Sequence, residues 1–579
     1  LVNFTVRAED MTPVEIASLL SSYRAKKKYH RFKDGSFASL EDDSLTADLE
    51  RLDTIAQELD MSSRELATGE MEVAPYHAFL LDSLVDDAEK ENSFRKFVSA
   101  FEDGRGQHHE LPEGLEGVLR PYQVEGFNWL SMLADTGLAG ILADEMGLGK
   151  SLQVISFLLG RQAELDGAPA MIVCPASLVY NWQAEFRKFA PGMRVSLLAG
   201  TRAQRDAIRA KGGYQVLVTS YDTLRIDISS FDGMSFSCQV IDEAQMIKNH
   251  NTKVARAVKE VRAGYRIALT GTPIENRLSE LWSIFDYLMP GMLGPYKRFR
   301  ERYEAPIIAG DEEVSARLSA KVGPFILRRL KKDVLADLPD KLETSVRVKL
   351  EGEQLKLYTA HEARLRHALA EGDDDSIREG KIAVLAELTR LRQLCCDPRL
   401  LYDNAKKHGA KLGAIVELVQ AAQDSGNKVL IFSQFVSFLE LIGDELAARG
   451  WAYHVITGST PKKKRLELVD RFNSDDVPVF LISLKAGGTG LNLTGASVVI
   501  HADPWWNVAA QNQATDRAHR IGQTQDVSVF KVIADSTIEE RILELQEAKS
   551  NLADAVLAAD GTSLASLDRD ELISLLGGD

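Results

Sequence analysis

A chain of 579 residues is too long for one hydrophobic core, and this length indicates about three or four domains. With 45% hydrophobic and 27% charged residues it has a globular composition, and no run of about 18 apolar residues predicts a membrane span. A net charge of −16, taken alone, argues against binding of nucleic acid. Local basic clusters can still line a cleft in an acidic protein.

Residues 1–112 precede the first regular α/β pattern and are expected to form a separate N-terminal region. The stretch "KKKYHRFKDGSFASL" (26–40) predicts a hairpin with Asp34 and Gly35 at the turn. Basic residues gather in and before this hairpin, and such a cluster is usually a solvated face. The six basic residues are Arg24, Lys26, Lys27, Lys28, Arg31 and Lys33. The same interpretation applies to the basic stretches at 325–335 and 461–465.

Two series of short apolar runs follow, and each alternates with helical patterns. Buried parallel strands are continuous apolar runs, so each series predicts an α/β lobe with a parallel sheet. The first series comprises 139–143, 170–174, 215–219, 239–241 and 267–269. The second comprises 428–432, 453–456, 478–482, 498–501 and 527–533. Between them the pattern is mostly helical, and residues 381–394 are clearly amphipathic.

These patterns predict an α/β protein with five parts. The parts are the N-terminal region (1–112), lobe 1 (113–280), helical insertions with the inter-lobe linker (281–410), lobe 2 (411–545) and a tail (546–579). Within the tail, residues 563–576 predict a short helix. The chain begins with Leu1 and shows no signal-peptide pattern, which indicates a fragment or a processed product. Four cysteines without metal-ligand spacing predict reduced thiols in the cytoplasm.

In lobe 1, "ILADEMGLGKSLQ" (141–153) ends like a phosphate-binding loop but carries Asp144 where the usual loop has its first glycine. An apolar strand precedes the loop and a helical pattern follows it, as such a loop requires. Gly147 and Gly149 allow the backbone to approach phosphates closely, and the helix N-terminus attracts them. Lys150 would contact the β- and γ-phosphates of ATP, and Ser151 would offer its hydroxyl to Mg²⁺.

Two carboxylates follow another strand of lobe 1, in "QVIDEAQ" (239–245). Asp242 can hold the Mg²⁺ shell while Glu243 polarises a water molecule. An acidic turn is the simpler interpretation of such a pair alone, but the phosphate loop about 90 residues earlier favours a catalytic role.

Lobe 2 carries "QNQATDRAHRIGQ" (511–523), in which Arg517 and Arg520 are three residues apart and would share one face of a helix. Two guanidinium groups on one face suit the charge that shifts in phosphoryl transfer. By itself the stretch would be interpreted as an exposed basic helix. Together with the phosphate loop and the paired acids, it predicts an ATPase site in the cleft between the lobes.

The ordered set of motifs resembles the Swi/Snf-type ATPase family of helicase superfamily two, and the resemblance covers about residues 115–575. The matching stretches in lobe 1 are "LRPYQVEGFNWL" (119–130), "ADEMGLGKS" (143–151), "IVCPASLVYNW" (172–182), "VTSYDTLR" (218–225), "DEAQMIKN" (242–249) and "LTGTPIENRLSELWS" (269–283). Those after it are "FILRRLKKDVLADLPDK" (325–341), "LRQLCCDP" (391–398), "IFSQF" (431–435), "SLKAGGTGLNLTGA" (483–496), "HADPWWN" (501–507) and "QATDRAHRIGQ" (513–523).

The resemblance implies two RecA-like lobes and an ATPase that moves along double-stranded DNA without separating its strands. It makes Asp144 a family variant and Gln123 the contact to adenine. Contacts to the DNA backbone are implied for Ser177, Thr219, Thr272, Gln434 and Thr489, and Trp506 matches a tryptophan that meets DNA. An ordinary packing role is the alternative for Trp506.

Departures from the family pattern indicate a bacterial member. Gln245 stands where eukaryotic remodellers carry histidine, and Ser151 replaces a more usual threonine. No segment resembles a histone-reading module, so histones are not expected as partners. We expect instead a monomer that acts on duplex DNA, with DNA-bound proteins or RNA polymerase as candidate protein partners. The hairpin at 26–40 could contact DNA or restrain the two lobes, and the sequence favours neither.

Two other functions stay open at this point. An RNA-directed helicase or an RNA-polymerase-recycling ATPase would share the phosphate loop and the paired acids, although "LTGTP" and "HRIGQ" favour the DNA branch. The other alternative is a nucleic-acid scaffold that does not hydrolyse ATP. The presence of Lys150, Asp242, Glu243, Arg517 and Arg520 argues against it.

Overall fold

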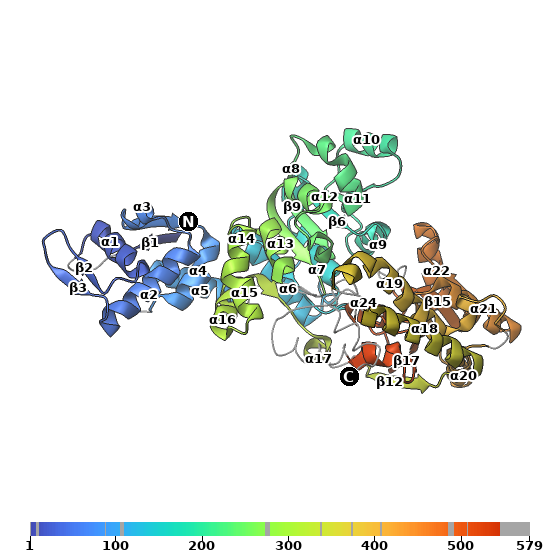
Figure 1. The fold of residues 1–579 in the computed structure, drawn as a ribbon. Coiled ribbons are helices and arrows are strands. Elements are labelled where there is room, and N and C mark those ends of the chain that lie inside the picture. The colour runs from blue at the N-terminus through green and yellow to red at the C-terminus, as the bar shows by residue number, and fades with distance from the viewer. Residues whose placement is uncertain are drawn as a thin grey trace.

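The computed structural model describes three bodies joined in a row: the N-terminal region at one end, lobe 1 in the middle and lobe 2 at the other end (Figure 1). The described residues are 2–6, 11–86, 89–104, 109–271, 278–335, 339–371, 374–405, 408–484, 491–505 and 508–544. The tail predicted at 546–579, with its helix at 563–576, lies outside these residues.

The N-terminal region packs helices against two small antiparallel sheets. Strand β1 (Val2–Thr5) pairs with β4 (Glu70–Val73), and β2 (Tyr29–Arg31) pairs with β3 (Phe37–Ser39) as the predicted hairpin. Gly35 has a φ of +92° at the turn, a backbone angle that glycine adopts without steric cost. The helices are α1 (Pro13–Arg24), α2 (Asp43–Glu58), α3 (Ser63–Leu66), η1 (Pro75–His77), α4 (Ala78–Leu84) and α5 (Asn92–Gly104).

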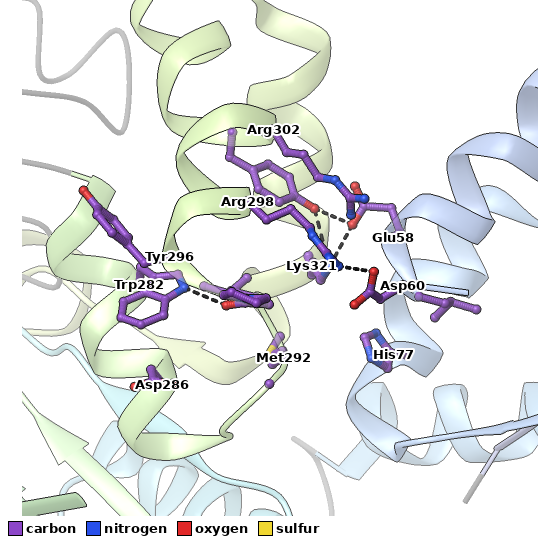
Figure 2. Close-up of a pocket in the computed structure, with 16 residues that line it drawn as sticks. Glu58, Asp60, His77, Trp282, Asp286, Met292, Tyr296, Arg298, Arg302 and Lys321 are labelled. Atoms are coloured by element: carbon purple, nitrogen blue, oxygen red, sulfur yellow. Dashed lines mark hydrogen bonds and ion pairs between the residues drawn. The ribbon is translucent and has the colours of Figure 1, made fainter. Parts of the chain in front are cut away.

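A buried ion pair joins the N-terminal region to the helices inserted after lobe 1 (Figure 2). Glu58 accepts a hydrogen bond from Lys321 Nζ at 2.7 Å, and both side chains are almost fully buried. Tyr303 donates its hydroxyl to the same carboxylate, and Arg298 pairs with Asp60 nearby. These residues border a cavity of about 440 Å³ between the two bodies. The N-terminal region is therefore docked on lobe 1.

Lobe 1 is built on a seven-stranded parallel sheet with the order β11-β5-β10-β9-β6-β8-β7. All five strands predicted from the first apolar series are present, and their central positions are fully buried. Two edge strands, β7 and β11, were not predicted because both are short and only partly buried. The strands are β5 (Gly140–Leu142), β6 (Ala170–Cys174), β7 (Val195–Leu198), β8 (Val216–Ser220), β9 (Ser235–Asp242), β10 (Arg262–Leu269) and β11 (Ile326–Leu327).

Helices connect these strands and bury their apolar sides against the sheet. Trp129, Phe157 and Trp182 are among the largest completely buried side chains in this layer. The helices are α6 (Pro121–Asp135), α7 (Lys150–Gly160), α8 (Gln162–Gly167), α9 (Val179–Phe189), α10 (Arg202–Lys211), α11 (Tyr221–Asp227), η3 (Ile228–Phe231), η4 (Ala244–Ile247) and α12 (Lys253–Glu260).

The segment between the lobes is mostly helical, as predicted, but it also supplies the edge strand β11 to the lobe 1 sheet and β12 to the lobe 2 sheet. The amphipathic stretch at 381–394 lies within α19. The helices are α13 (Leu278–Leu288), α14 (Tyr296–Phe299), the π-helix η5 (Arg300–Glu304), α15 (Ala305–Ile308), α16 (Glu312–Val322), η6 (Gly323–Phe325), α17 (Lys331–Val334), α18 (Gly352–Glu371), α19 (Asp374–Cys396) and η7 (Pro398–Leu400).

Lobe 2 has a six-stranded parallel sheet with the order β12-β17-β16-β13-β15-β14, and it contains all five strands of the second apolar series. The strands are β12 (Lys341–Val348), β13 (Val429–Ser433), β14 (Tyr453–Ile456), β15 (Val479–Ser483), β16 (Val498–His501) and β17 (Val527–Ala534). The labelled helices are α20 (Ala410–Asp424), α21 (Val436–Ala448), α22 (Lys462–Ser474) and α24 (Val508–Thr515), and the chain is helical again at 538–544. The fold is thus α/β with two parallel-sheet lobes, as predicted.

All four cysteines are buried, and none of them forms a disulfide in the described part of the chain. None of the helices in the described part of the chain has the length and hydropathy that crossing a membrane requires.

Candidate nucleotide site between the lobes

The phosphate loop connects β5 to α7, at the carboxyl edge of the lobe 1 sheet. Gly147 and Gly149 have φ values of +89° and +75°, in the left-handed region that favours glycine. A Cβ on Gly147 would lie 2.9 Å from Cβ of Arg520, and one on Gly149 would lie 2.5 Å from Nε2 of Gln123. Both positions therefore require glycine, and the loop is enclosed by lobe 2 on one side and by α6 on the other.

Asp144, which replaces the first glycine of the usual loop, fixes the loop through hydrogen bonds of its side chain. Its carboxylate is completely buried and accepts hydrogen bonds from Arg329 Nε at 2.9 Å, Arg329 Nη2 at 2.6 Å and Gln153 Nε2 at 3.0 Å. A two-pronged contact from a guanidinium group fixes both the position and the plane of a carboxylate.

Arg329 and Lys331 belong to the basic stretch at 325–335, for which the sequence predicted a solvated face. That prediction is wrong for these two residues, because each is buried against an acidic partner. Lys331 Nζ donates to Asp516 Oδ1 at 2.6 Å and to the His519 carbonyl at 2.7 Å, both in lobe 2. The stretch therefore contacts the phosphate loop through Arg329 and, through Lys331, the segment that carries the two arginines.

Lys150 is the first residue of α7, and its Nζ donates to the Asp144 carbonyl at 2.6 Å. Burial lowers the pKa of Lys150, while the carboxylates of Glu243, Asp144 and Asp242 favour its charged form. An anionic ligand beside Nζ would favour that charged form further.

Asp242 ends strand β9, and Glu243 follows it with a left-handed φ of +54°. Trp182 Nε1 donates to Asp242 Oδ2 at 3.0 Å, and the Glu243 amide donates to Oδ1 at 2.9 Å. Burial, with a further contribution from Glu243, raises the pKa of Asp242 to about 7. A cation beside this carboxylate would lower its pKa again.

Glu243 is oriented by amides from both lobes. Gln245 Nε2 donates to Oε2 at 2.8 Å, and Gln513 Nε2, from lobe 2, donates to Oε1 at 3.2 Å. The Thr270 hydroxyl donates to Gln245 Oε1 at 3.2 Å and so orients that amide. A left-handed φ at a non-glycine residue costs free energy, and such strain is concentrated at functional sites.

Arg517 and Arg520 both reach the lobe 1 site, but not from a helix as the sequence predicted. Helix α24 ends at Thr515, and the two arginines lie in the turns that follow it. Arg517 is buried beside Glu243 and Asp242, and burial together with Arg520 lowers its pKa to about 10. Burial also lowers the pKa of Arg520, which lies over Gly147.

Ser151 has a half-buried neighbour that the sequence did not single out. The carboxylate of Glu185, on α9, lies near the Ser151 hydroxyl, which favours the charged form of Glu185. Glu185 Oε1 also accepts a hydrogen bond from Asn181 Nδ2 at 3.1 Å. Burial raises the pKa of Glu185, and the charge of Arg520 opposes that shift. Since Trp182 is one turn away on the same helix, α9 lies beside both Ser151 and Asp242. The sequence alone could not identify Glu185 as a neighbour of the site, because residues 179–189 have the pattern of an ordinary amphipathic helix. Its role follows from where α9 packs in the fold.

Gln123 lies against the loop, and both ends of its amide are bonded within the protein. Its Nε2 donates to the Leu148 carbonyl at 3.1 Å, and its Oε1 accepts from the Arg120 amide at 3.0 Å. The side chain is 2% exposed, so a contact with adenine requires at least one of these bonds to be exchanged.

Three of the six residues implied as DNA contacts lie within the part of the chain that the structure describes. Ser177 is half-buried just before α9, and Gln434 follows β13 with its Oε1 bonded to Arg392 Nη1 at 3.0 Å. Thr219 is completely buried in β8 and presents no surface to a DNA backbone in this structure. Thr272, Thr489 and Trp506 lie outside the described residues.

The geometry defines a class of protein: a two-lobed protein with a phosphate loop and paired acids on one lobe and two arginines supplied by the other. Residues 122–400 match the SNF2-related domain, residues 410–522 match the helicase conserved C-terminal domain, and residues 1–112 match the bacterial SNF2 helicase associated region. The chain belongs to the Swi/Snf-type (SNF2) family of helicase superfamily two and is a bacterial-type member.

Individual relatives agree with this assignment. An uncharacterized ATP-dependent helicase of Mycoplasma genitalium is 39% identical over 470 residues, which are 81% of this chain and 45% of that protein. The SWI/SNF-related matrix-associated actin-dependent regulator of chromatin subfamily A member 1 of Mus musculus is 36% identical over 486 residues, 79% of this chain and 46% of that protein. The chain thus spans about half the length of these curated relatives.

Among solved structures, the Sulfolobus solfataricus SWI2/SNF2 ATPase core in complex with dsDNA is 36% identical. The match covers 80% of this chain and 97% of that chain, with a TM-score of 0.40.

Proposed function

We propose that this chain is the motor of an ATP-dependent double-stranded DNA translocase, which hydrolyses ATP between its lobes and moves along duplex DNA without separating the strands. The observation that carries the proposal is the approach of Arg517 and Arg520 to the phosphate loop, where Cβ of Arg520 lies 2.9 Å from a Cβ built on Gly147. Residues from both lobes therefore surround one site, so hydrolysis and lobe movement are linked.

In the proposed site, backbone N–H groups of the Gly147–Gly149 loop and Lys150 bind the phosphates of ATP. Ser151 and Asp242 fit a Mg²⁺ ion, because a hydroxyl and a half-buried carboxylate of raised pKa are oxygen ligands that a cation would favour. When bound, Mg²⁺ neutralises charge on the phosphate oxygens.

The remaining roles are assigned by position. Glu243 accepts the proton of the attacking water, held in place by the amides of Gln245 and Gln513. Arg517 and Arg520 stabilise the charge that develops on the transferred phosphoryl group. Gln123 contacts adenine after it exchanges its bond to the Leu148 carbonyl.

DNA would lie across both lobes, with contacts from Ser177 on lobe 1 and Gln434 on lobe 2. Thr272, Thr489 and Trp506 are further contacts implied by the family resemblance. Contacts to phosphates carry no sequence information, so a regular duplex backbone would let such a motor advance on any sequence. Helix α9 supports this coupling, because it starts beside Ser177, its Trp182 donates to Asp242, and its Glu185 lies near Ser151.

We further propose that the protein works as a monomer on DNA in the cytoplasm and acts on DNA-bound proteins or RNA polymerase. A DNA-bound obstacle suits a motor that tracks the backbone and leaves the strands paired. The matched bacterial SNF2 helicase associated region at 1–112 supports a bacterial setting for this work.

The test is the rate of ATP hydrolysis at one low salt concentration, measured without nucleic acid and with single-stranded DNA, duplex DNA or RNA. We expect strong stimulation by duplex DNA, and loss of hydrolysis in Lys150→Ala and Glu243→Gln proteins. Normal hydrolysis by either variant would contradict the site assignment. Stimulation by RNA but not by duplex DNA would replace the translocase with an RNA-directed ATPase.

Movement without strand separation needs its own measurement. The protein should displace a third strand from a triplex while a forked duplex of the same length stays paired. Unwinding of the fork would contradict the proposed mode of movement.

A further inference from the structure

The β2–β3 hairpin presents an open sheet face that carries two aromatic rings. Tyr29 and Arg31 alternate with the buried His30 on β2, and Arg31 lies opposite Phe37 on β3. Tyr29 is 59% exposed and Phe37 66% exposed, values that are unusual for aromatic side chains. His30 holds the other face inward through a 2.8 Å contact between its Nδ1 and the Ser22 hydroxyl. The rings therefore face solvent because the hairpin orients them outward.

Positive charge surrounds this face. Arg31 lies 5.7 Å from the centre of the Phe37 ring, and Lys28 forms an exposed ion pair with Glu41 at 2.9 Å. Lys26, Lys27 and Lys33 are exposed and form no ion pair with any residue that the structure describes. The turn residue Asp34 is acidic, but its carboxylate accepts hydrogen bonds from the amide and hydroxyl of Ser36. On a chain of net charge −16, this face carries a local excess of positive charge, although Glu15 lies near Lys33.

Lys26 occupies a backbone position that favours glycine. It follows α1 with a φ of +51°, and its amide donates to the Tyr23 carbonyl at 2.8 Å. Helices commonly end in this left-handed conformation with glycine, which has no Cβ to strain. A lysine at this position strains the backbone where glycine would not. If the lysine has a function that offsets this cost, its positive charge is the property involved.

The position of the hairpin argues against a restraint on the lobes. Glu58 and Lys321 dock the N-terminal region on the helices inserted after lobe 1 (Figure 2). Strands β2 and β3 lie at the end of that region furthest from lobe 2 (Figure 1). The hairpin is therefore held in a fixed place on the motor, with its aromatic face free of the rest of the described chain.

We propose that this face, Tyr29, Arg31 and Phe37 with Lys26, Lys27 and Lys33 around it, binds single-stranded nucleic acid. Unpaired bases stack on exposed aromatic rings, whereas the bases of a duplex are already stacked and inaccessible. Diagonal neighbours such as Tyr29 and Phe37 on paired strands are about 7–8 Å apart, so each ring can take its own base. The lysines contact the phosphates. This role does not depend on the proposed motor activity.

The experiment uses the full chain and fluorescence anisotropy with labelled octamers: single-stranded DNA, the same sequence as RNA, and its duplex. Tyr29→Ala with Phe37→Ala removes both rings, while Tyr29→Phe with Phe37→Tyr keeps them as the matched control. We expect ring removal to weaken single-strand binding about fivefold or more, since stacking is worth about 1–3 kcal/mol per base. Duplex binding and basal ATP hydrolysis should not change.

Charge is tested by Lys26→Gly, which also relieves the backbone strain. This variant should unfold at the same or a higher temperature and yet bind single strands more weakly, with a salt slope smaller by about 0.7. Lys96→Ser, at an exposed lysine of α5, is the control and should change neither quantity. A preference for DNA or for RNA supports the proposal and identifies the strand. Single-strand affinity within twofold of the wild type after ring removal, or an equal loss on duplex DNA, would overturn it.

Discussion

The Glu185 carboxylate lies near the Ser151 hydroxyl, and this proximity leads to a prediction for metal binding. A hydroxyl that donates to a neighbouring carboxylate keeps its lone pairs free for a cation, and losing such a supporting group typically costs about 10–100-fold in metal affinity. Glu185→Ala should therefore raise the Mg²⁺ concentration for half-maximal hydrolysis about tenfold. The measurement is a Mg²⁺ titration of ATP hydrolysis, together with binding of a fluorescent nucleotide in chelator.

Glu185→Gln serves as the matched variant, because its amide oxygen can still accept from Ser151. It should shift the Mg²⁺ midpoint less than Glu185→Ala does. Nucleotide binding in chelator should stay near the wild-type value in both variants. An unchanged Mg²⁺ midpoint in Glu185→Ala would show that Glu185 does not position Ser151.

At the scale of elements, the segment after β11 joins the two lobes through Lys331. Its bonds to Asp516 and to the His519 carbonyl hold the turns from which Arg517 and Arg520 reach lobe 1. Misplacing groups that act in the transition state by about 1 Å can cost 10²-fold in rate. Lys331→Met should lower kcat about ten- to hundredfold while the affinity for a fluorescent nucleotide stays within about twofold. Lys332→Met, at the exposed neighbour, should leave kcat unchanged.

The pairing of β12 with β17 at the edge of the lobe 2 sheet predicts a dependence on pH. Burial would raise the pKa of Glu343, but hydrogen bonds from Lys531 and Lys341 outweigh burial and lower it to about 2. The pKa of Glu343 is lower in the folded protein than in the unfolded chain. The charged Glu343 therefore stabilises the fold fully above about pH 4.5, and this contribution is lost as pH falls toward 2. Glu343→Gln should therefore lose less thermal stability than the wild type between pH 6 and pH 3. Glu417→Gln, an exposed control, should behave as the wild type.

At the scale of the whole molecule, the Glu58–Lys321 pair determines how the N-terminal region is carried by lobe 1. Breaking a buried ion pair by removing one partner typically costs about 3–5 kcal/mol, because the other charge stays buried. Lys321→Met should lower the stability of this interface by about that amount, seen as a lower unfolding temperature and faster hydrogen exchange in α4 and α16. Exposed pairs are worth about 0–1 kcal/mol, so Arg202→Met, which removes the exposed pair with Asp206, should have a small effect.

Replacing both partners separates the pair from its surroundings. Lys321→Met with Glu58→Leu leaves no buried charge, and it should be close to the wild type in stability. If the double variant is as unstable as Lys321→Met, packing around Tyr303 and not the ion pair holds the interface.

Much of the site was predictable because its signals are local. A strand, two glycines, a lysine and a serine lie within one short stretch, and Asp242 and Glu243 are adjacent after another strand. Arg329, Lys331, Glu185 and Gln513 were missed, since each gains its role from a partner far away in the chain. For the same reason the basic stretch at 325–335 resembled a solvated face, although its burial partners lie in the phosphate loop and in lobe 2.

The amino-acid sequence alone determined the two parallel-sheet lobes and the hairpin at 26–40, because strand burial and turn chemistry are local properties. The tertiary structure alone decided that Asp144 pairs with Arg329 and that Arg517 and Arg520 reach lobe 1 from turns. The tertiary structure also decided that Arg520 of lobe 2 lies against Gly147 of lobe 1, and that the N-terminal region is docked on the helices inserted after lobe 1. These are contacts between residues distant in the chain, and their free energies depend on burial and on charge partners that only the folded arrangement provides.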